Sequence, residues 1–242
     1  MKTSPYCLSR TLFALAACLL AGSATSRANQ IFWSDWTTKN VGTPSGGSAA
    51  GTLVGLGVTV SYTGEVDAPR GDGAFPSWDP TSTYSGGFVG NAPNASYGSI
   101  GLTGGQRIVD TITFSQPVVD PVMAIWSLGN GGNTASFNFL TSAPITIVCG
   151  GPSAEYGGGS LFGSGSTISG NEDNGTIEFV GTFSQISFTS TVEATAGYAF
   201  TIGAASVSVP DSALPLPLTC LTLLGLVVWS RFTPRQAVLR KQ

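Results

Sequence analysis

The stretch Asp110-Thr-Ile-Thr-Phe-Ser115 alternates polar and apolar side chains one residue at a time. Because successive side chains on a β-strand point to opposite faces, Ile112 and Phe114 share one face of the expected strand and the threonines share the other. The stretch Gln185-Ile-Ser-Phe-Thr189 repeats this alternation. Both stretches therefore predict half-buried antiparallel strands.

Similar short runs of β-branched and aromatic residues continue on both sides of these two stretches. Clusters of Gly, Asn, Ser and Pro separate them, and no amphipathic helix pattern lies between them. The ten expected strands span residues 31–36, 51–56, 58–62, 108–114, 122–128, 135–139, 145–149, 176–180, 185–189 and 198–204. We therefore predict an all-β domain over residues 29–208, folded as an antiparallel β-sandwich, of which the jelly roll is one form.

The segment 65–105 differs from the rest of this domain, because it is rich in Pro, Gly, Ser and Asn. Its aromatic residues are Phe75, Trp78, Tyr84, Phe88 and Tyr97. Irregular segments of this length are uncommon in compact domains and are often functional. The rings either stack on sugars or pin the segment to the core, and Trp78, Tyr84 and Phe88 are the candidate glycan contacts.

Residues 1–28 have the features of a secretory signal peptide. Lys2 and Arg10 give a basic start, residues 11–22 are apolar, and small residues precede a cut after Ala28. The apolar part has about 12 residues, fewer than the roughly 20 that a helix needs to span a membrane. We therefore expect the protein to be exported and this peptide to be removed.

Residues 209–242 contain three parts in a fixed order. The motif Val209-Pro210-Asp211-Ser212-Ala213 comes first, an apolar helix over 214–229 follows, and four basic residues lie within 230–242. Basic residues resist translocation, so this end stays on the cytoplasmic face while the preceding domain lies outside. The apolar run has about 16 residues, which is short for a permanent span. We expect it to hold the protein in the inner membrane transiently.

The order of motif, apolar helix and basic end resembles the PEP-CTERM class of bacterial sorting signals, in the variant whose motif is Val-Pro-Asp-Ser-Gly. Val209, Pro210, Asp211 and Ser212 match this motif, and Ala213 replaces its glycine. The resemblance implies that a membrane-embedded exosortase recognises the motif, cuts near it and passes the protein to the envelope or an exopolysaccharide matrix. The alternative is an ordinary single-span anchor.

The composition of the domain limits its partners and its chemistry. Residues 29–208 hold three basic residues against twelve acidic ones, so the domain repels nucleic acid and anionic lipid but tolerates neutral glycans and divalent cations. The chain has no histidine, which removes Ser-His-Asp, Cys-His and imidazole metal sites. Cys149 is the one cysteine of this domain, and we expect it to be a small buried apolar side chain. We predict no enzyme, no catalytic residue and no metal ligand.

The carboxylate side chains suggest two further possibilities, a polysaccharide hydrolase and a calcium site. A polysaccharide hydrolase needs only two carboxylates about 5 to 9.5 Å apart, and the acids of the aromatic segment are Glu65, Asp67, Asp72 and Asp79. The stretches 67–72 and 171–175 are candidate calcium loops, since carboxylate and amide oxygens suit that cation. The second stretch favours a type I′ turn at Asn174-Gly175 between two strands. The expected cofactor is none, with calcium as a compatible ion.

Together these features predict an exported envelope or extracellular-matrix protein with a non-enzymatic structural or adhesive domain. Its expected partners are an exosortase-like processing enzyme, an exopolysaccharide and, transiently, the inner membrane. A carbohydrate-binding module is the first alternative function and a polysaccharide hydrolase is the second.

Overall fold

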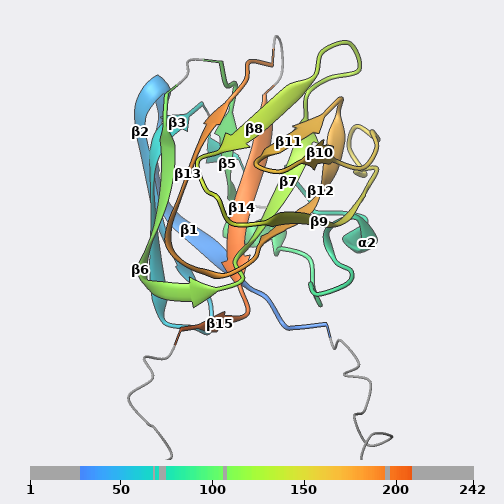
Figure 1. Cartoon of the computed structure of the whole chain (residues 1–242). Coiled ribbons are helices and arrows are strands. Elements are labelled where there is room, and N and C mark those ends of the chain that lie inside the picture. Colours follow the sequence, from blue (N-terminus) through green and yellow to red (C-terminus); the bar gives the residue numbers. More distant parts are fainter. Residues whose placement is uncertain (1–27, 68, 71–74, 106–107, 194–196, 209–242) are drawn as a thin grey trace, which may run out of the picture. The chain divides into compact units, whose positions relative to one another are not determined.

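The computed structural model describes residues 28–208, apart from 68, 71–74, 106–107 and 194–196 (Figure 1). The expected signal peptide, the sorting motif Val209 to Ser212, the apolar run and the basic end lie outside the described residues. Within the described part, no helix has the length and apolar character that crossing a membrane requires.

The described chain is almost entirely β-structure, which confirms the all-β prediction. The strands are β1 (Phe32–Asn40), β2 (Gly42–Leu53), β3 (Val58–Val66), β4 (Pro69–Arg70), β5 (Ser99–Leu102), β6 (Asp110–Val119), β7 (Val122–Leu128), β8 (Ala135–Phe139), β9 (Ile145–Gly151), β10 (Phe162–Ser164), β11 (Thr167–Gly170), β12 (Asp173–Phe179), β13 (Thr182–Ser190), β14 (Tyr198–Ala204) and β15 (Ser206–Val207). Two short helices, α2 (Thr81–Tyr84) and η1 (Ala95–Tyr97), lie between β4 and β5. Each of the ten predicted strands overlaps an observed one, whereas β4, β5, β10, β11 and β15 were not predicted.

The named strands pair antiparallel and form one strongly curled sheet. Its order is β10-β11-β8-β13-β6-β3-β2-β1-β14-β7-β12-β9, with β15 on β6, β5 on β14 and β4 on β5. Strand β1 joins the two halves, because Phe32 and Trp33 pair with β14 whereas Ser34 onward pairs with β2. The sheet closes almost into a barrel, with β9 and β10 at the two ends of the strand order (Figure 1).

The two alternating stretches of sequence lie side by side in this sheet. Strands β6 and β13 pair, and Ile112 lies opposite Ile186. Both isoleucines, together with Phe114 and Phe188, are buried in the main core inside the curled sheet, as the alternation predicted. The phenylalanine ring of Phe137 on β8 lies within 5.1 Å of the Phe188 ring, centroid to centroid, in an edge-to-face arrangement.

A second hydrophobic cluster lies on the outer side of β1, β14 and β7. On β7, Met123 and Ile125 belong to the main core while Ala124 and Trp126 belong to the second cluster, so the strand is buried on both faces. The segment 75–98 supplies the cover, through a set of apolar side chains that includes Trp78, Tyr84 and Val89. It belongs to the stretch 65–105 that was expected to be irregular, and its buried rings give the sheet a second buried layer.

A buried acidic network joins the end of β3 to the beginning of β6. The carboxylate of Asp110 accepts hydrogen bonds from the Tyr62 hydroxyl (2.9 Å) and the Glu65 backbone N–H (2.8 Å). The carboxylate of Glu65 accepts hydrogen bonds from the backbone N–H groups of Thr103 (3.1 Å) and Gly104 (2.8 Å) and from the Thr103 hydroxyl. Burial raises the pKa of Asp110 to about 6.

This raised pKa predicts a pH dependence of stability that Asp110→Asn removes. The unfolded chain loses the Asp110 proton near pH 4 and the folded chain near pH 6, so the proton stabilises the fold below pH 4 and this contribution is lost as the pH rises through 6. The shift corresponds to about 3 kcal/mol in the free energy of unfolding. Urea unfolding from pH 3.5 to 7.5 measures it, and parallel curves for the wild type and Asp110→Asn would contradict the assignment.

Candidate functional site

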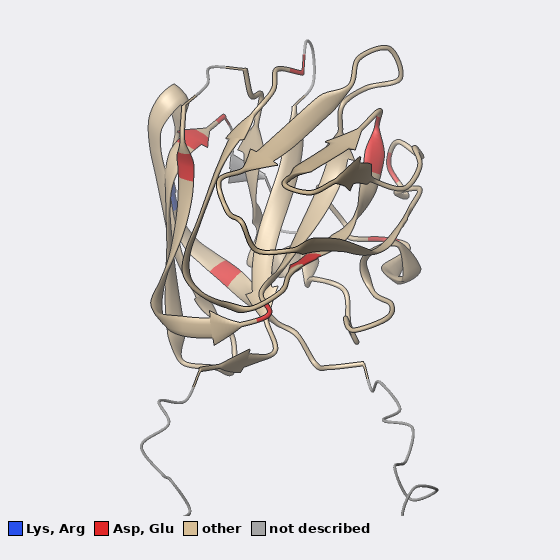
Figure 2. Ribbon diagram, viewed as in Figure 1, with Lys and Arg blue, Asp and Glu red and all other residues tan. Residues whose placement is uncertain are grey.

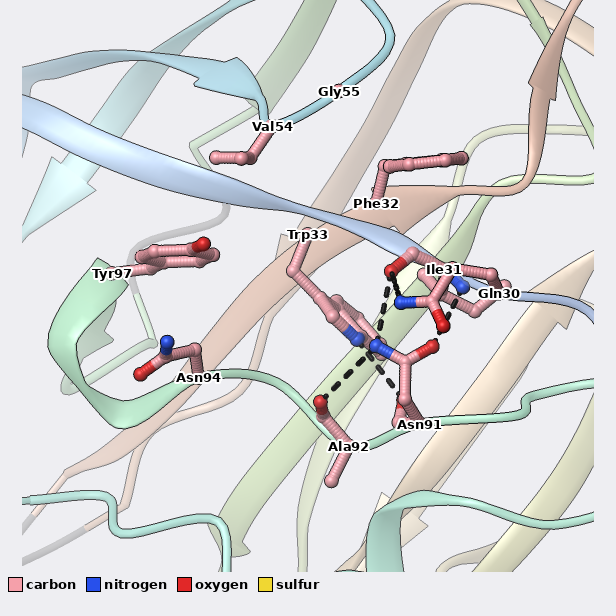
Figure 3. A pocket seen from close by; sticks show the side chains of 10 residues that line it. All are labelled: Gln30, Ile31, Phe32, Trp33, Val54, Gly55, Asn91, Ala92, Asn94 and Tyr97. Atoms are coloured by element: carbon pink, nitrogen blue, oxygen red, sulfur yellow. Dashed lines mark hydrogen bonds between the residues drawn. The ribbon is translucent and has the colours of Figure 1, made fainter.

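A groove of about 430 Å³ opens beside the start of β1 (Figure 3). It is lined by Gln30, Ile31, Phe32, Trp33, Val54, Gly55, Asn91, Ala92, Asn94 and Tyr97. Three parts of the chain meet here: the beginning of β1, the turn between β2 and β3, and the segment 91–97 that leads into β5. The volume falls within the range of small-molecule sites in proteins.

Asn91 fixes the segment against β1. Its side-chain oxygen accepts a hydrogen bond from the Ile31 backbone N–H (2.7 Å), and its amide nitrogen donates to the Ile31 carbonyl (3.0 Å). The Trp33 indole N–H in turn donates to the Asn91 carbonyl (3.1 Å). The Asn91 amide thus acts as an added strand residue beside β1, and its hydrogen-bonding groups are used by the protein itself.

Other polar groups of the groove remain available to a ligand. The Asn94 side-chain oxygen accepts hydrogen bonds from the backbone and hydroxyl of Ser96, which leaves its NH₂ group without a partner among the described residues. The Tyr97 hydroxyl, on a half-exposed ring, also has no hydrogen-bond partner there. Tyr97 and Asn94 lie together on one side of Trp33 in Figure 3, and Gln30 and Asn91 lie on the other.

Gly55 allows the turn between β2 and β3 to approach Phe32. A Cβ atom added at Gly55 would lie 2.6 Å from the Phe32 ring, and the backbone φ of +99° is one that other residues rarely adopt. The glycine therefore sets the position of Val54, which is 38% exposed at the rim of the groove.

The candidate glycan contacts Trp78, Tyr84 and Phe88 do not line the groove. Trp78 and Tyr84 are 1% and 0% exposed and form an edge-to-face pair 5.1 Å apart in the second cluster. Phe88 is half-buried against the same cluster. A sugar cannot stack on a ring without an exposed face, so Trp78 and Tyr84 pin the segment to the sheet. Within this segment, Tyr97 is the aromatic residue that lines the groove.

Of the acids considered for a hydrolase, Glu65, Asp67 and Asp79 lie among the described residues. Glu65 is buried and binds Thr103 and Gly104, whereas the exposed Asp79 accepts a hydrogen bond from Ala154 N–H at its backbone carbonyl (2.8 Å). Asp67 is half-buried, and Asp72 lies outside the described residues. Burial raises the pKa of the Cys149 thiol on β9, which disfavours the reactive thiolate.

The expected turn at Asn174-Gly175 is wrong, because both residues lie within β12. Asn174 is fully buried, and its side-chain oxygen accepts a hydrogen bond from the Ser127 backbone N–H (2.7 Å) where the pairing of β7 and β12 shifts register. The neighbouring Asp173 carboxylate accepts hydrogen bonds from Gly159 and Asn171 N–H. The polar stretch 171–175 therefore holds a bulge together, and the described residues include no group of three or more potential metal ligands.

The groove is thus a partly aromatic hollow in an acidic domain. Figure 2 shows the acidic residues spread over the fold, and Lys39 is the one basic residue among those whose side chains are described. Comparison with known proteins finds no matching family model, no similar curated protein and no similar solved structure. The arrangement suits an uncharged ligand that offers hydroxyl groups and an apolar ring face.

The role of Asn91 predicts a loss of stability when its amide is removed. Asn91→Ala leaves the Ile31 N–H without its side-chain partner and leaves the Ile31 C=O with only a long hydrogen bond from the Gln30 amide (3.4 Å). This loss should lower the free energy of unfolding by about 1–3 kcal/mol. Asn94→Ala is the matched control, because Asn94 is exposed and its side chain caps only the short η1 helix. Equal urea midpoints for Asn91→Ala and the wild type would show that the segment does not depend on this contact.

Proposed function

We propose that this chain is an exported, non-enzymatic component of the cell envelope or extracellular matrix, with a structural or adhesive β domain. A signal peptide over residues 1–28 directs export. An exosortase-like enzyme recognises Val209 to Ser212 and removes the tail after the apolar run 214–229 has held the protein in the inner membrane. The order of motif, apolar run and basic end supports this route.

The interior of the domain supports a structural role over a catalytic one. Glu65, Asp110 and Asp173 are buried carboxylates, and each accepts backbone N–H hydrogen bonds that join separate strands or loops. Carboxylates used in this way hold separate parts of the fold together. We also propose that the curled sheet is a β-sandwich, since β1 changes partners after Trp33 and so divides the sheet into two antiparallel layers.

Carbohydrate binding is the second candidate function, and the groove favours it. The half-exposed ring of Tyr97 offers a face for stacking. The Tyr97 hydroxyl and the Asn94 NH₂ group, which have no partner among the described residues, offer hydrogen bonds to the hydroxyl groups of a neutral sugar. The excess of acidic residues argues for a neutral polysaccharide over an acidic one. Both an adhesive matrix protein and a carbohydrate-binding module could bind sugar in this groove. In the module, sugar binding is the primary function of the domain.

The sorting proposal predicts the mass of the mature protein. Intact mass spectrometry of the protein from its native host should show a chain that begins at Asn29 and ends near residues 209–213. A mature chain that still carries residues 214–242 would contradict the sorting proposal and support an ordinary membrane anchor.

The groove proposal predicts a specific loss of glycan affinity. In affinity electrophoresis through gels that contain neutral polysaccharides, Tyr97→Ala should weaken retention about tenfold, because the ring and its hydroxyl are both removed. Phe162→Ala removes an exposed ring on β10, away from the groove lining, and should leave retention unchanged. Equal retention of Tyr97→Ala and the wild type would remove the groove as a sugar site.

A further inference from the structure

Two exposed aromatic rings meet on a buried tryptophan at a second place on the outer face of the sheet. Phe75 is 47% exposed and Tyr156 is 58% exposed, whereas Trp126 on β7 is 1% exposed. The ring centroids of Phe75 and Tyr156 lie 6.4 Å and 5.4 Å from that of Trp126, with interplanar angles of 40° and 46°. We call this group the aromatic platform. None of its residues lines the groove of Figure 3.

Hydrogen bonds fasten the two segments that carry the exposed rings. The Glu155 carboxylate accepts one hydrogen bond from the Ser77 backbone N–H (2.8 Å) and another from the Trp126 indole N–H (3.0 Å). The Ala154 N–H donates to the Asp79 carbonyl (2.8 Å), so the segment before α2 is tied directly to the segment after β9. The platform is therefore held in shape before any ligand arrives, which lowers the entropic cost of binding.

The charge of Glu155 adds a hydrogen-bond acceptor at the platform. Partial burial raises the pKa of Glu155, but the hydrogen bonds from Ser77 and Trp126 lower it further than burial raises it, so the net pKa is below its ordinary value. The carboxylate is therefore ionised at neutral pH. Its oxygens accept hydrogen bonds from the Ser77 backbone N–H and the Trp126 indole N–H, and the Ser77 side chain and the Glu155 backbone also bond to this carboxylate.

Exposed rings beside an ionised acceptor match one class of ligand. A pyranose ring presents an apolar C–H face, which stacks on an aromatic ring, and a rim of hydroxyl groups, which donate to a carboxylate. A protein partner would need a larger continuous apolar surface than two rings provide. The acidic domain disfavours polyanionic polysaccharides.

We propose that Phe75, Tyr156 and Glu155 form a second binding site, for the neutral pyranose units of a polysaccharide. The rings stack on the sugar and Glu155 accepts hydrogen bonds from its hydroxyl groups. This site stands apart from the groove: Trp33 pairs with Gly203 and Trp126 with Ala199 on the intervening strand β14, which places the two tryptophan Cα atoms about 16 Å apart. The platform proposal therefore holds or fails independently of the groove.

Affinity electrophoresis of the folded protein tests the platform, with dextran, galactomannan and soluble β-glucan as neutral probes and alginate as the acidic probe. At least one neutral probe should retard the wild type while alginate does not. On the Tyr97→Ala background, which removes the groove ring, Phe75→Ala and Tyr156→Ala should each weaken the remaining retention about tenfold, and the triple variant should lose it. Glu155→Gln keeps the side-chain shape and should weaken retention less than the loss of a ring. Circular dichroism and thermal unfolding confirm that each variant is folded.

Two further single-residue variants, Phe162→Ala and Tyr97→Ala, distinguish the possible outcomes. Phe162→Ala should leave retention unchanged, because this exposed ring belongs to neither site. Retention of the triple variant equal to that of Tyr97→Ala overturns the platform. If Tyr97→Ala abolishes retention while the Phe75→Ala/Tyr156→Ala double variant keeps it, the groove alone binds sugar and the proposed function survives without the platform. Failure of every neutral probe to retard the wild type also overturns the platform.

Discussion

The packing of segment 75–98 against the outer faces of β1, β14 and β7 is the contact on which the described architecture depends. A strand that is apolar on both sides needs cover on both sides, and β7 and β14 are buried along their whole length. The curled sheet covers the inner face, and Trp78 and Tyr84 lie among the residues that cover the outer one. Without this segment, the ring of Trp126 and the side chains around it would face water.

The two candidate binding sites lie at the margins of this cover. On the β1 side the segment ends in Asn91 to Tyr97, and its contact with Ile31 and Trp33 leaves the groove open beside it. On the β7 side the segment begins with Phe75, which packs on Trp126 next to Tyr156. Aromatic residues therefore have two fates within one segment: the central ones are buried, and those near its ends keep an exposed face.

Short runs of alternating, β-branched or aromatic residues were sufficient to predict the all-β class and the central strands. Val122 to Leu128, Ala135 to Phe139 and Tyr198 to Ala204 are strands over the predicted residues, because their β-branched and aromatic content has one structural explanation. Strands such as β10 and β11 are short and rich in Gly and Ser. Their sequences carry no strand pattern, and they are strands because they pair with neighbouring strands.

The candidate sites were harder to predict, because each one joins distant parts of the chain. Asn91 binds Ile31, 60 residues away, and Glu155 binds Trp126 and Ser77, which are 29 and 78 residues away. No local spacing signals such contacts. Asn174 illustrates the opposite failure: its sequence context is that of a tight turn, yet its amide is used to stabilise a bulge inside β12.

The pairing of β1 with β14 has a mechanical consequence. Phe32 lies opposite Ala204 in antiparallel register, so the first and last long strands of the domain meet at their outer ends. Tension between the start of β1 and the end of β14 pulls the two strands apart at right angles to their length. The hydrogen bonds of this pair then bear the load one after another and break in sequence. Tension transmitted from the platform on β7 to the end of β14 runs along the strands and loads several bonds at once. The pairing of β7 with β14 should therefore resist tension better than the pairing of β1 with β14.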